Sequence, residues 1–204
     1  MLLMETKSRK GDKLKSSGRR SDRGATMVEF GIVAVVLFTL IFGVIEGAFA
    51  IRARNTINNA TDDAARRGAV AGTSPNADFL ILRQLEGRGA TTAATIEYVV
   101  VYKADDGSSA IPAGCALGTA SAECNVYQPD AFAAAEADFA CGGALNVQWC
   151  PAQRGTGDEL GFLGVYVKAK YEPIVEQLFI EMDFEVNANS LQAIETSGEP
   201  LNGP

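Results

Sequence analysis

The chain contains no histidine among its 204 residues. Histidine is the side chain that most often acts as a general base at neutral pH, and it is also a frequent metal ligand. The sequence also lacks the nucleophile-elbow, phosphate-loop and dinucleotide-binding patterns of common enzyme classes. We therefore expect a protein that is not an enzyme and that holds no metal ion or other cofactor.

Basic residues become scarce after residue 24. Residues 1–24 hold eight of the 18 Lys and Arg and three of the 25 acidic residues, so their net charge is 8 − 3 = +5. The rest of the chain holds ten basic and 22 acidic residues, and its net charge is 10 − 22 = −12. So acidic a body would repel phosphates, and the leader has no aromatic residue for base stacking, which argues against a nucleic-acid partner. A basic leader before an apolar run and an acidic body follows the positive-inside rule, which predicts a cytoplasmic leader and a translocated body.

The longest apolar run has few interruptions. No charged residue occurs in 30–45, and only Glu46 interrupts the run before it ends at Ile51. As a helix, residues 30–51 would reach roughly 33 Å, enough to cross a hydrocarbon core of about 30 Å. The run therefore predicts a single-pass membrane helix. A cleaved secretory signal is the alternative, because Ala48-Phe49-Ala50 has a small-x-small pattern, but the run exceeds the usual h-region of about 7–15 residues.

The start of this run follows a recognisable order. The leader ends at Gly24, and the segment continues as Ala25-Thr26-Met27-Val28-Glu29-Phe30. This order resembles the processing site of type IV prepilins, where a basic leader ends in glycine and the mature apolar helix has glutamate at its fifth position. With Gly43-Val44-Ile45-Glu46 and Ala65-Arg66-Arg67-Gly68-Ala69 in register downstream, residues 23–72 resemble the TadE-like pseudopilins of tight-adherence (Flp, type IVc) pilus systems.

This resemblance implies a role for three residues. A prepilin peptidase in the membrane would cut after Gly24 and free the amine of Ala25. A carboxylate at bilayer depth is costly unless it is paired, so the amine of a neighbouring subunit would pair with Glu29 and set the register of assembly. Uniform head-to-tail contacts generate open filaments. The implied partners are the membrane, the prepilin peptidase, other pilin or pseudopilin subunits and the pilus assembly platform.

The implied location is the bacterial inner membrane, with the N-terminus cytoplasmic, the C-terminal domain periplasmic, and incorporation into an extracellular pilus left open. A plain single-pass anchored domain that binds an envelope ligand or partner is the alternative function. The two hypotheses differ on Glu29, since only the pilin hypothesis requires this carboxylate for assembly.

The second carboxylate of the run, Glu46, has two interpretations. Gly43 and Gly47 have the spacing that lets helices approach closely, so Glu46 could sit in a packing notch and pair with Arg52 or Arg54 of a neighbour. The favoured interpretation is a carboxylate already in the far headgroup layer, because a single Gly-x-x-x-Gly is weak evidence.

Beyond the membrane the helical period continues, with small residues at three- and four-residue steps up to a breaker cluster at 72–76. A short amphipathic helix is predicted at Ala77–Glu86, and strands at Thr95–Lys103, Phe162–Tyr171 and Leu178–Ala193. The positions at these helical steps are Ala53, Ile57, Ala60, Ala64 and Gly68. The inward face of the predicted strand Phe162–Tyr171 is formed by Val165, Val167, Ala169 and Tyr171.

All four cysteines lie in the irregular segment 105–157. Their spacing is not that of a zinc or thioredoxin-like site, and disulfides are natural on a translocated body. Three pairings are possible, and we favour the local one, with free thiols as the alternative. A helix over Pro129–Ala140 is expected between the pairs. The favoured pairs are Cys115 with Cys124 and Cys141 with Cys150.

The sequence thus predicts an α+β protein: a long N-terminal helix, transmembrane in its first half, carrying a small antiparallel sheet with a disulfide-stapled insertion. The expected segments are the cleaved leader 1–24, the transmembrane and stalk helix 25–72 with about 28–51 in the membrane, and the domain 73–204, which includes the insertion 105–157 and a flexible tail 196–204. Tyr171-Glu172-Pro173 fits the strand pair with which TadE-like chains commonly end. The acidic row Glu181, Asp183 and Glu185 is expected to be a solvated strand face rather than a cation site.

Overall fold

The computed structural model describes residues 21–104, 107–108, 110–154, 161–173 and 184–194, with side chains from residue 24 onward. The chain forms two compact units, Met1–Val44 and Ile45–Pro204. The first unit contains the beginning of helix α1, which spans Ser21–Ala71. Every described side chain from Gly24 to Val44 is exposed except the half-buried Ala34. The predicted long apolar N-terminal helix is confirmed, and it is long and apolar enough to cross a membrane.

The second unit is built on a four-stranded antiparallel sheet with the strand order β2-β1-β3-β4. Strands β1 and β3 are central and pair along almost their whole length. The strands are β1 (Thr95–Ala104), β2 (Cys124–Tyr127), β3 (Phe162–Tyr171) and β4 (Phe184–Ala193).

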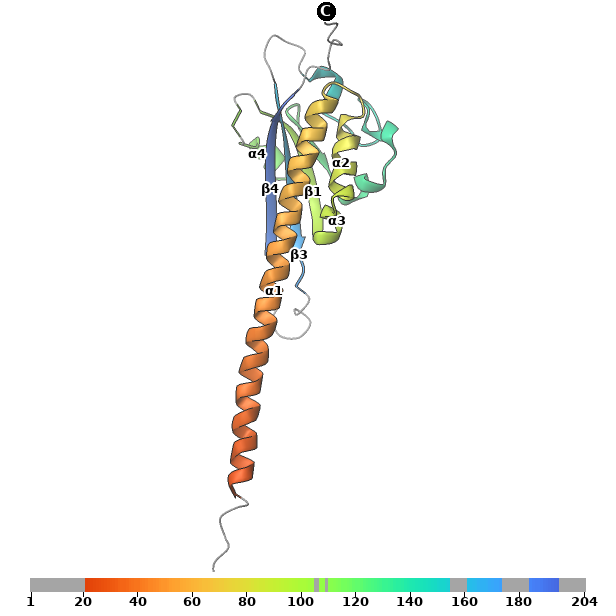
Figure 1. Cartoon of the computed structure of the whole chain (residues 1–204). Coiled ribbons are helices and arrows are strands. Elements are labelled where there is room, and N and C mark those ends of the chain that lie inside the picture. The colour runs from red at the N-terminus through yellow and green to blue at the C-terminus, as the bar shows by residue number, and fades with distance from the viewer. Residues whose placement is uncertain (1–20, 105–106, 109, 155–160, 174–183, 195–204) are drawn as a thin grey trace, which may run out of the picture. The chain divides into compact units, whose positions relative to one another are not determined.

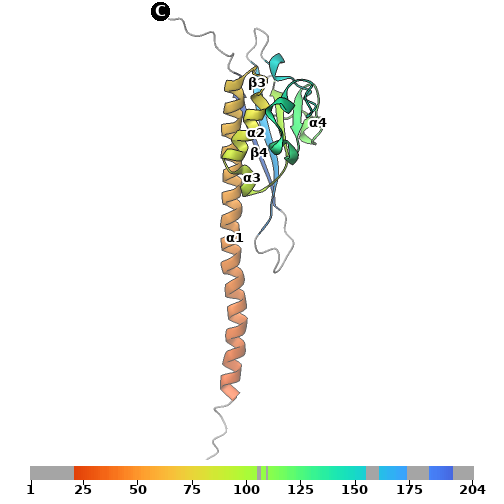
Figure 2. The ribbon, with the colours of Figure 1, turned by 90° about the vertical axis from the view of Figure 1, so that its right-hand side faces the viewer.

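Helices α1 and α2 lie together on one face of this sheet (Figures 1 and 2). Helix α2 spans Ala77–Gly87, and a short helix α3, Ala90–Ala93, leads into β1. Helix α4, Ala113–Ala116, packs against the other face. The remaining helical segments are 3₁₀ turns: η1 (Pro129–Ala133), η2 (Glu136–Phe139) and η3 (Pro151–Gln153).

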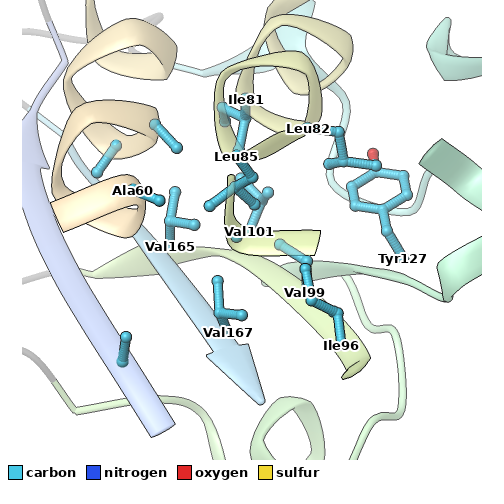
Figure 3. Close-up of a cluster of buried hydrophobic side chains, with 14 of the residues drawn as sticks. Ala60, Ile81, Leu82, Leu85, Ile96, Val99, Val101, Tyr127, Val165 and Val167 are labelled. Atoms are coloured by element: carbon cyan, nitrogen blue, oxygen red, sulfur yellow. The ribbon is translucent and has the colours of Figure 1, made fainter. Parts of the chain in front are cut away.

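The main core fills the space between the sheet and helices α1 and α2 (Figure 3). The small residues of α1, such as Ala60, are buried because their size lets the helix approach the sheet closely. Gly68 has the tightest fit of this stripe: a Cβ atom there would lie 2.5 Å from Cδ1 of Ile81. From β3 the inward positions alternate as predicted, and Val165, Val167, Ala169 and Tyr171 are all buried.

A smaller core cluster covers the opposite face of the sheet. It contains Val100 and Tyr102 of β1 together with the cysteines of one disulfide. The ring of Tyr102 lies over Gly164 of the paired strand β3, so closely that any side chain at Gly164 would overlap it. A glycine inside this central strand is therefore required by a close approach rather than by a bend.

The predicted helix over Pro129–Ala140 is wrong. The structure has two 3₁₀ turns there, separated by Ala134 and Ala135 in extended conformation. The carboxylate of Asp138 accepts a hydrogen bond from the Ala135 backbone N–H at 3.0 Å, which starts a new turn instead of continuing the first. An alanine-rich segment with few large apolar residues has little packing to favour one continuous helix over this local alternative.

The other predicted elements are confirmed within a residue at their ends, namely α2, β1 and β3. Of the predicted strand Leu178–Ala193, β4 begins at Phe184, and Glu181 and Asp183 lie outside the described residues, as do residues 1–20 of the leader and the tail 196–204. Glu185, the described member of the acidic row, is exposed on β4. Strand β2 was not predicted.

Candidate functional site

The residues predicted for processing and assembly lie on the first turns of α1. Gly24, Ala25 and Glu29 are all helical and exposed. Ala25 and Glu29 are four positions apart, so they share one face of the helix and are separated by about 6 Å along its axis. Around them the exposed surface of α1 is apolar, including Met27, Val28 and Phe30.

The two glycines of the predicted packing notch are open within this chain. A Cβ atom added at Gly43 or Gly47 would meet no heavy atom within 4 Å. The surface around them carries Val44, Phe42 and Leu40, all substantially exposed. Such a surface is available to lipid or to another helix, and small residues there permit a close approach.

Glu46 belongs to the second unit and has a hydrogen-bond partner within it. The hydroxyl of Tyr171 at the end of β3 donates a hydrogen bond to Oε1 of Glu46 at 2.7 Å. Burial, followed by the hydrogen bond and the charge of Glu46, raises the pKa of Tyr171 to about 12. The hydroxyl therefore stays protonated and remains a donor at any physiological pH. The alternation of the strand predicts Tyr171 on its inward face, but nothing in the sequence connects Tyr171 with Glu46.

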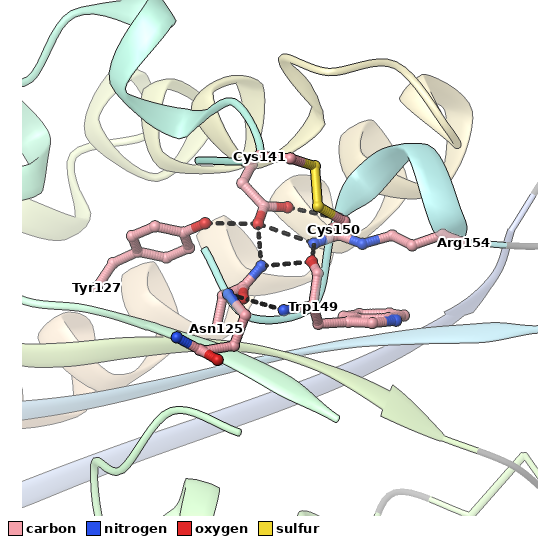
Figure 4. Close-up of a disulfide and its surroundings, with 8 residues drawn as sticks. Asn125, Tyr127, Cys141, Trp149, Cys150 and Arg154 are labelled. Carbon is pink, nitrogen blue, oxygen red and sulfur yellow. Dashed lines mark hydrogen bonds and ion pairs between the residues drawn. A yellow bond between two sulfur atoms is a disulfide. The ribbon is translucent and has the colours of Figure 1, made fainter. Parts of the chain in front are cut away.

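A second polar cluster is fully buried beneath the insertion (Figure 4). Asp78 lies in the first turn of α2. The two terminal guanidinium nitrogens of Arg154 each donate a hydrogen bond to one of its carboxylate oxygens, to Oδ1 at 2.5 Å and to Oδ2 at 2.8 Å. Its Oδ2 also accepts hydrogen bonds from Asn125 at 2.8 Å and from the hydroxyl of Tyr127 at 2.6 Å. Burial and the charge of Asp78 raise the pKa of Tyr127, so this hydroxyl is a permanent donor.

The same cluster binds the loop before Arg154. Asn125 accepts hydrogen bonds from the backbone N–H groups of Gln148 and Trp149 at 2.9 and 2.7 Å and donates to the Trp149 carbonyl at 2.8 Å. The guanidinium of Arg154 lies 4.1 Å from the centre of the Trp149 ring. These hydrogen bonds lie away from solvent and make the cluster a structural clamp that holds 148–154 against α2 and β2, while Nε of Arg154 has no partner among the described residues.

Both favoured disulfides are present. Cys115 is joined to Cys124, and Cys141 is joined to Cys150, each pair nine positions apart. The first fixes α4 to β2, and the second closes the loop that carries Trp149 toward Arg154 (Figure 4). The structure has no free cysteine, so the alternative of free thiols is wrong. Among the described residues no group of His, Cys, Asp or Glu side chains is arranged to hold a metal ion.

Sequence reasoning missed Asp78 and Arg154. A signal existed for Asp78, which lies in the apolar stripe of α2 with Ala77, Ile81 and Leu85, all buried. An acid on such a face must find a partner. Arg154 follows an irregular turn, and no local pattern distinguishes it from an exposed arginine.

Comparison with known proteins gives one family match. Residues 24–66 match the family model described as TadE-like protein. The match begins at Gly24, includes both Glu29 and Glu46, and ends at Arg66 in the downstream arginine-glycine segment. It covers about a fifth of the chain and none of the sheet. No curated protein and no solved structure gives a significant match. Residues 24–66 are therefore similar to the TadE-like family, a family of minor pilins associated with tight-adherence pili.

Proposed function

We propose that the chain is a non-enzymatic minor pilin or pseudopilin of a tight-adherence pilus, made as a precursor, cleaved after Gly24 and assembled through Glu29. The observation that carries this proposal is the family match, which starts at the glycine where the basic leader ends. In this proposal residues 1–24 are the leader, 25–72 the membrane and stalk helix, and 73–204 the periplasmic domain.

Cleavage changes the charge of the helix start. Hydrolysis of the bond between Gly24 and Ala25 removes a leader of net charge +5 and leaves a single cation, the amine of Ala25. A cation at a helix N-terminus opposes the helix dipole, which makes a nearby carboxylate favourable. Glu29 is the first carboxylate after Ala25 and is exposed, so it is accessible to an amine from outside the chain.

Assembly follows from the surface around these groups. The exposed side chains of this helix from Met27 to Ile51 are apolar apart from Glu29 and Thr39, and Glu46 is half-buried. In hydrocarbon an unpaired Glu29 is costly, whereas pairing with the amine of a staggered neighbour offsets that cost. Only one stagger brings the two groups together, so the pair would set the register of adjacent helices.

The charge and the disulfides support one orientation. The basic leader favours the cytoplasm by the positive-inside rule. Two disulfides in the C-terminal part favour an oxidising compartment, which is the periplasm for an inner-membrane protein. The membrane, the prepilin peptidase, other pilin subunits and the assembly platform are the partners that this orientation requires.

The test replaces the carboxylate and follows assembly. In a strain that makes tight-adherence pili, Glu29→Leu should abolish pilus-dependent surface attachment while the protein remains in the membrane fraction. Val28→Leu, a change at the adjacent exposed position, should leave attachment intact. Normal attachment by the Glu29→Leu strain would instead favour the alternative of a plain anchored envelope domain, for which this carboxylate has no task.

A further inference from the structure

A polar pocket of about 670 Å³ lies in the second unit between α1, α3, the start of β1 and the end of β3. Its lining includes Phe49 and Arg52 from α1, Arg88 from the turn before α3, and Glu172 just after β3. None of the residues assigned to processing, to helix packing or to the disulfides lines it. The pocket borders the Glu46–Tyr171 bond, because Tyr171 also lines it, but its charged lining residues take no part in that bond.

The pocket lies where the apolar run of α1 ends. Ile51 is the last residue of the run, and Phe49 and Arg52, on either side of that end, both line the pocket. A membrane helix leaves the hydrocarbon at the point where its apolar residues give way to cations. In a membrane-anchored chain the mouth of this pocket would therefore lie at the level of the lipid headgroups.

Two guanidinium groups supply the positive charge of the lining. Arg52 is exposed and makes no ion pair with the described residues. Arg88 forms an ion pair with Asp63 through its Nε atom, which lies 2.8 Å from Oδ2 of Asp63. The terminal nitrogens of Arg88 are therefore available, and guanidinium forks match the oxygens of a phosphate better than an ammonium does.

The remaining polar lining suits the groups attached to such a phosphate. Thr91 and Thr92 bring hydroxyls to the rim, and Glu172, which accepts a hydrogen bond from Thr95 at 3.4 Å, provides one carboxylate. Hydroxyl and amino substituents are what a glycerol or ethanolamine headgroup presents next to its phosphate. The acyl chains would pass down beside Phe49, which is exposed and apolar.

We propose that this pocket binds the phosphate of a membrane phospholipid through Arg52 and Arg88. The proposal goes beyond pilus assembly and shares with the proposed function only the membrane anchor. A bound headgroup would give the second unit a direct contact with the bilayer surface. The observation that favours a lipid over free phosphate is the position of the pocket at the end of the apolar run.

The experiment measures co-purified lipid on the full-length protein. Protein extracted in mild detergent from membranes of phosphatidylglycerol and phosphatidylethanolamine is examined by native mass spectrometry for retained phospholipid. The double variant Arg52→Gln/Arg88→Gln should retain about tenfold less lipid, the effect of losing charge-assisted hydrogen bonds. Arg66→Gln/Arg67→Gln, which removes two exposed arginines of α1 outside the pocket, should retain as much as the unaltered protein.

Three further measurements decide between explanations. Arg52→Lys/Arg88→Lys keeps the charge without the planar fork, and intermediate retention is expected. Isothermal titration of the lipid-free protein with inorganic phosphate should give little heat, and binding as strong as that of lipid would overturn the lipid proposal in favour of free phosphate. Equal retention by the Gln variant and the unaltered protein would overturn it as well. Failure of the full chain to float with vesicles would contradict both this proposal and the membrane anchor.

Discussion

Tyr171 and Glu46 lie 125 positions apart in sequence and are joined by a hydrogen bond of 2.7 Å. The bond links the end of β3 to the turn of α1 that contains Gly43 and Gly47. The bond gives Glu46 a hydrogen-bond donor within its own chain. From the sequence, Arg52 or Arg54 of a neighbouring subunit was the partner considered for Glu46. The acid would then orient the sheet domain on the helix just where the apolar run ends.

Removal of this donor should destabilise the sheet domain. Tyr171→Phe keeps the buried ring and removes the hydroxyl, and we expect a loss of about 1–3 kcal/mol in the free energy of unfolding, as for other hydrogen bonds to charged groups. Urea unfolding in detergent would measure it. Tyr166→Phe on the same strand removes a half-buried hydroxyl from the other face of the sheet and should cost less than about 0.5 kcal/mol. Equal losses from the two variants would contradict a special role for the Glu46 bond.

The same bond predicts a dependence on alkaline pH. Folding raises the pKa of Tyr171 from 10.0 to about 12, so the folded state favours the protonated form. The resulting stabilisation is fully present below about pH 10 and is lost as the pH rises toward about 12. The difference in unfolding free energy between the unaltered protein and Tyr171→Phe should be constant from pH 7 to about pH 10 and then shrink. A difference that stays constant through pH 11 would contradict this assignment.

The clamp beneath the insertion should be sensitive to the loss of either charge. Arg154→Met leaves Asp78 buried without its cation, and we expect a loss of about 3–5 kcal/mol in the free energy of unfolding. The pair Arg88–Asp63 is much more exposed, so Arg88→Gln should cost less than about 1 kcal/mol. Urea titration of both variants makes the comparison. The double variant Asp78→Asn/Arg154→Met should be more stable than the sum of its single changes predicts, because no buried charge remains.

Gly68 should tolerate a side chain only if Ile81 is shortened. Gly68→Ala places a methyl group against Cδ1 of Ile81, and we expect a loss of about 1–3 kcal/mol in the free energy of unfolding. A Cβ atom at Gly68 would also lie 2.7 Å from Cγ1 of Ile81, so Ile81→Ala, which removes both Cδ1 and Cγ1, should make the loss in the double variant smaller than the sum of the two single changes. Gly43→Ala, whose new methyl group meets no atom of the chain, serves as the control and should not lower that free energy. Strict additivity of Gly68→Ala and Ile81→Ala would contradict the packing explanation.

Local periodicity was sufficient to predict α1, α2, β1 and β3. Small residues at helical spacing and alternating apolar residues each leave one face to bury, and that face is the one the structure buries. The 3₁₀ turns at 129–139 were not predicted because an alanine-rich segment satisfies helical propensity, while the competing interaction, Asp138 with Ala135, is a matter of backbone geometry. Strand β2 has only four residues and depends on pairing with β1.

The candidate site divides in the same way. Gly24, Ala25 and Glu29 form a short contiguous motif, so the sequence alone can identify them. Tyr171 with Glu46, like Asp78 with Arg154, joins segments that only the fold brings together. The lining of the proposed headgroup pocket comes from three separate segments, 49–56, 88–95 and 171–172, and no spacing in the sequence relates Arg52 to Arg88.

The most direct test of the account is the N-terminal sequence of the protein isolated from membranes of its native host. Cleavage by the prepilin peptidase predicts a chain that begins at Ala25. Its intact mass should be lower than that of the precursor by the mass of residues 1–24. A host lacking the peptidase should yield the uncut precursor. A chain that begins at Met1 in the normal host would contradict processing and the pairing of the new amine with Glu29, and a chain that begins at Ile51 would indicate a secretory signal instead.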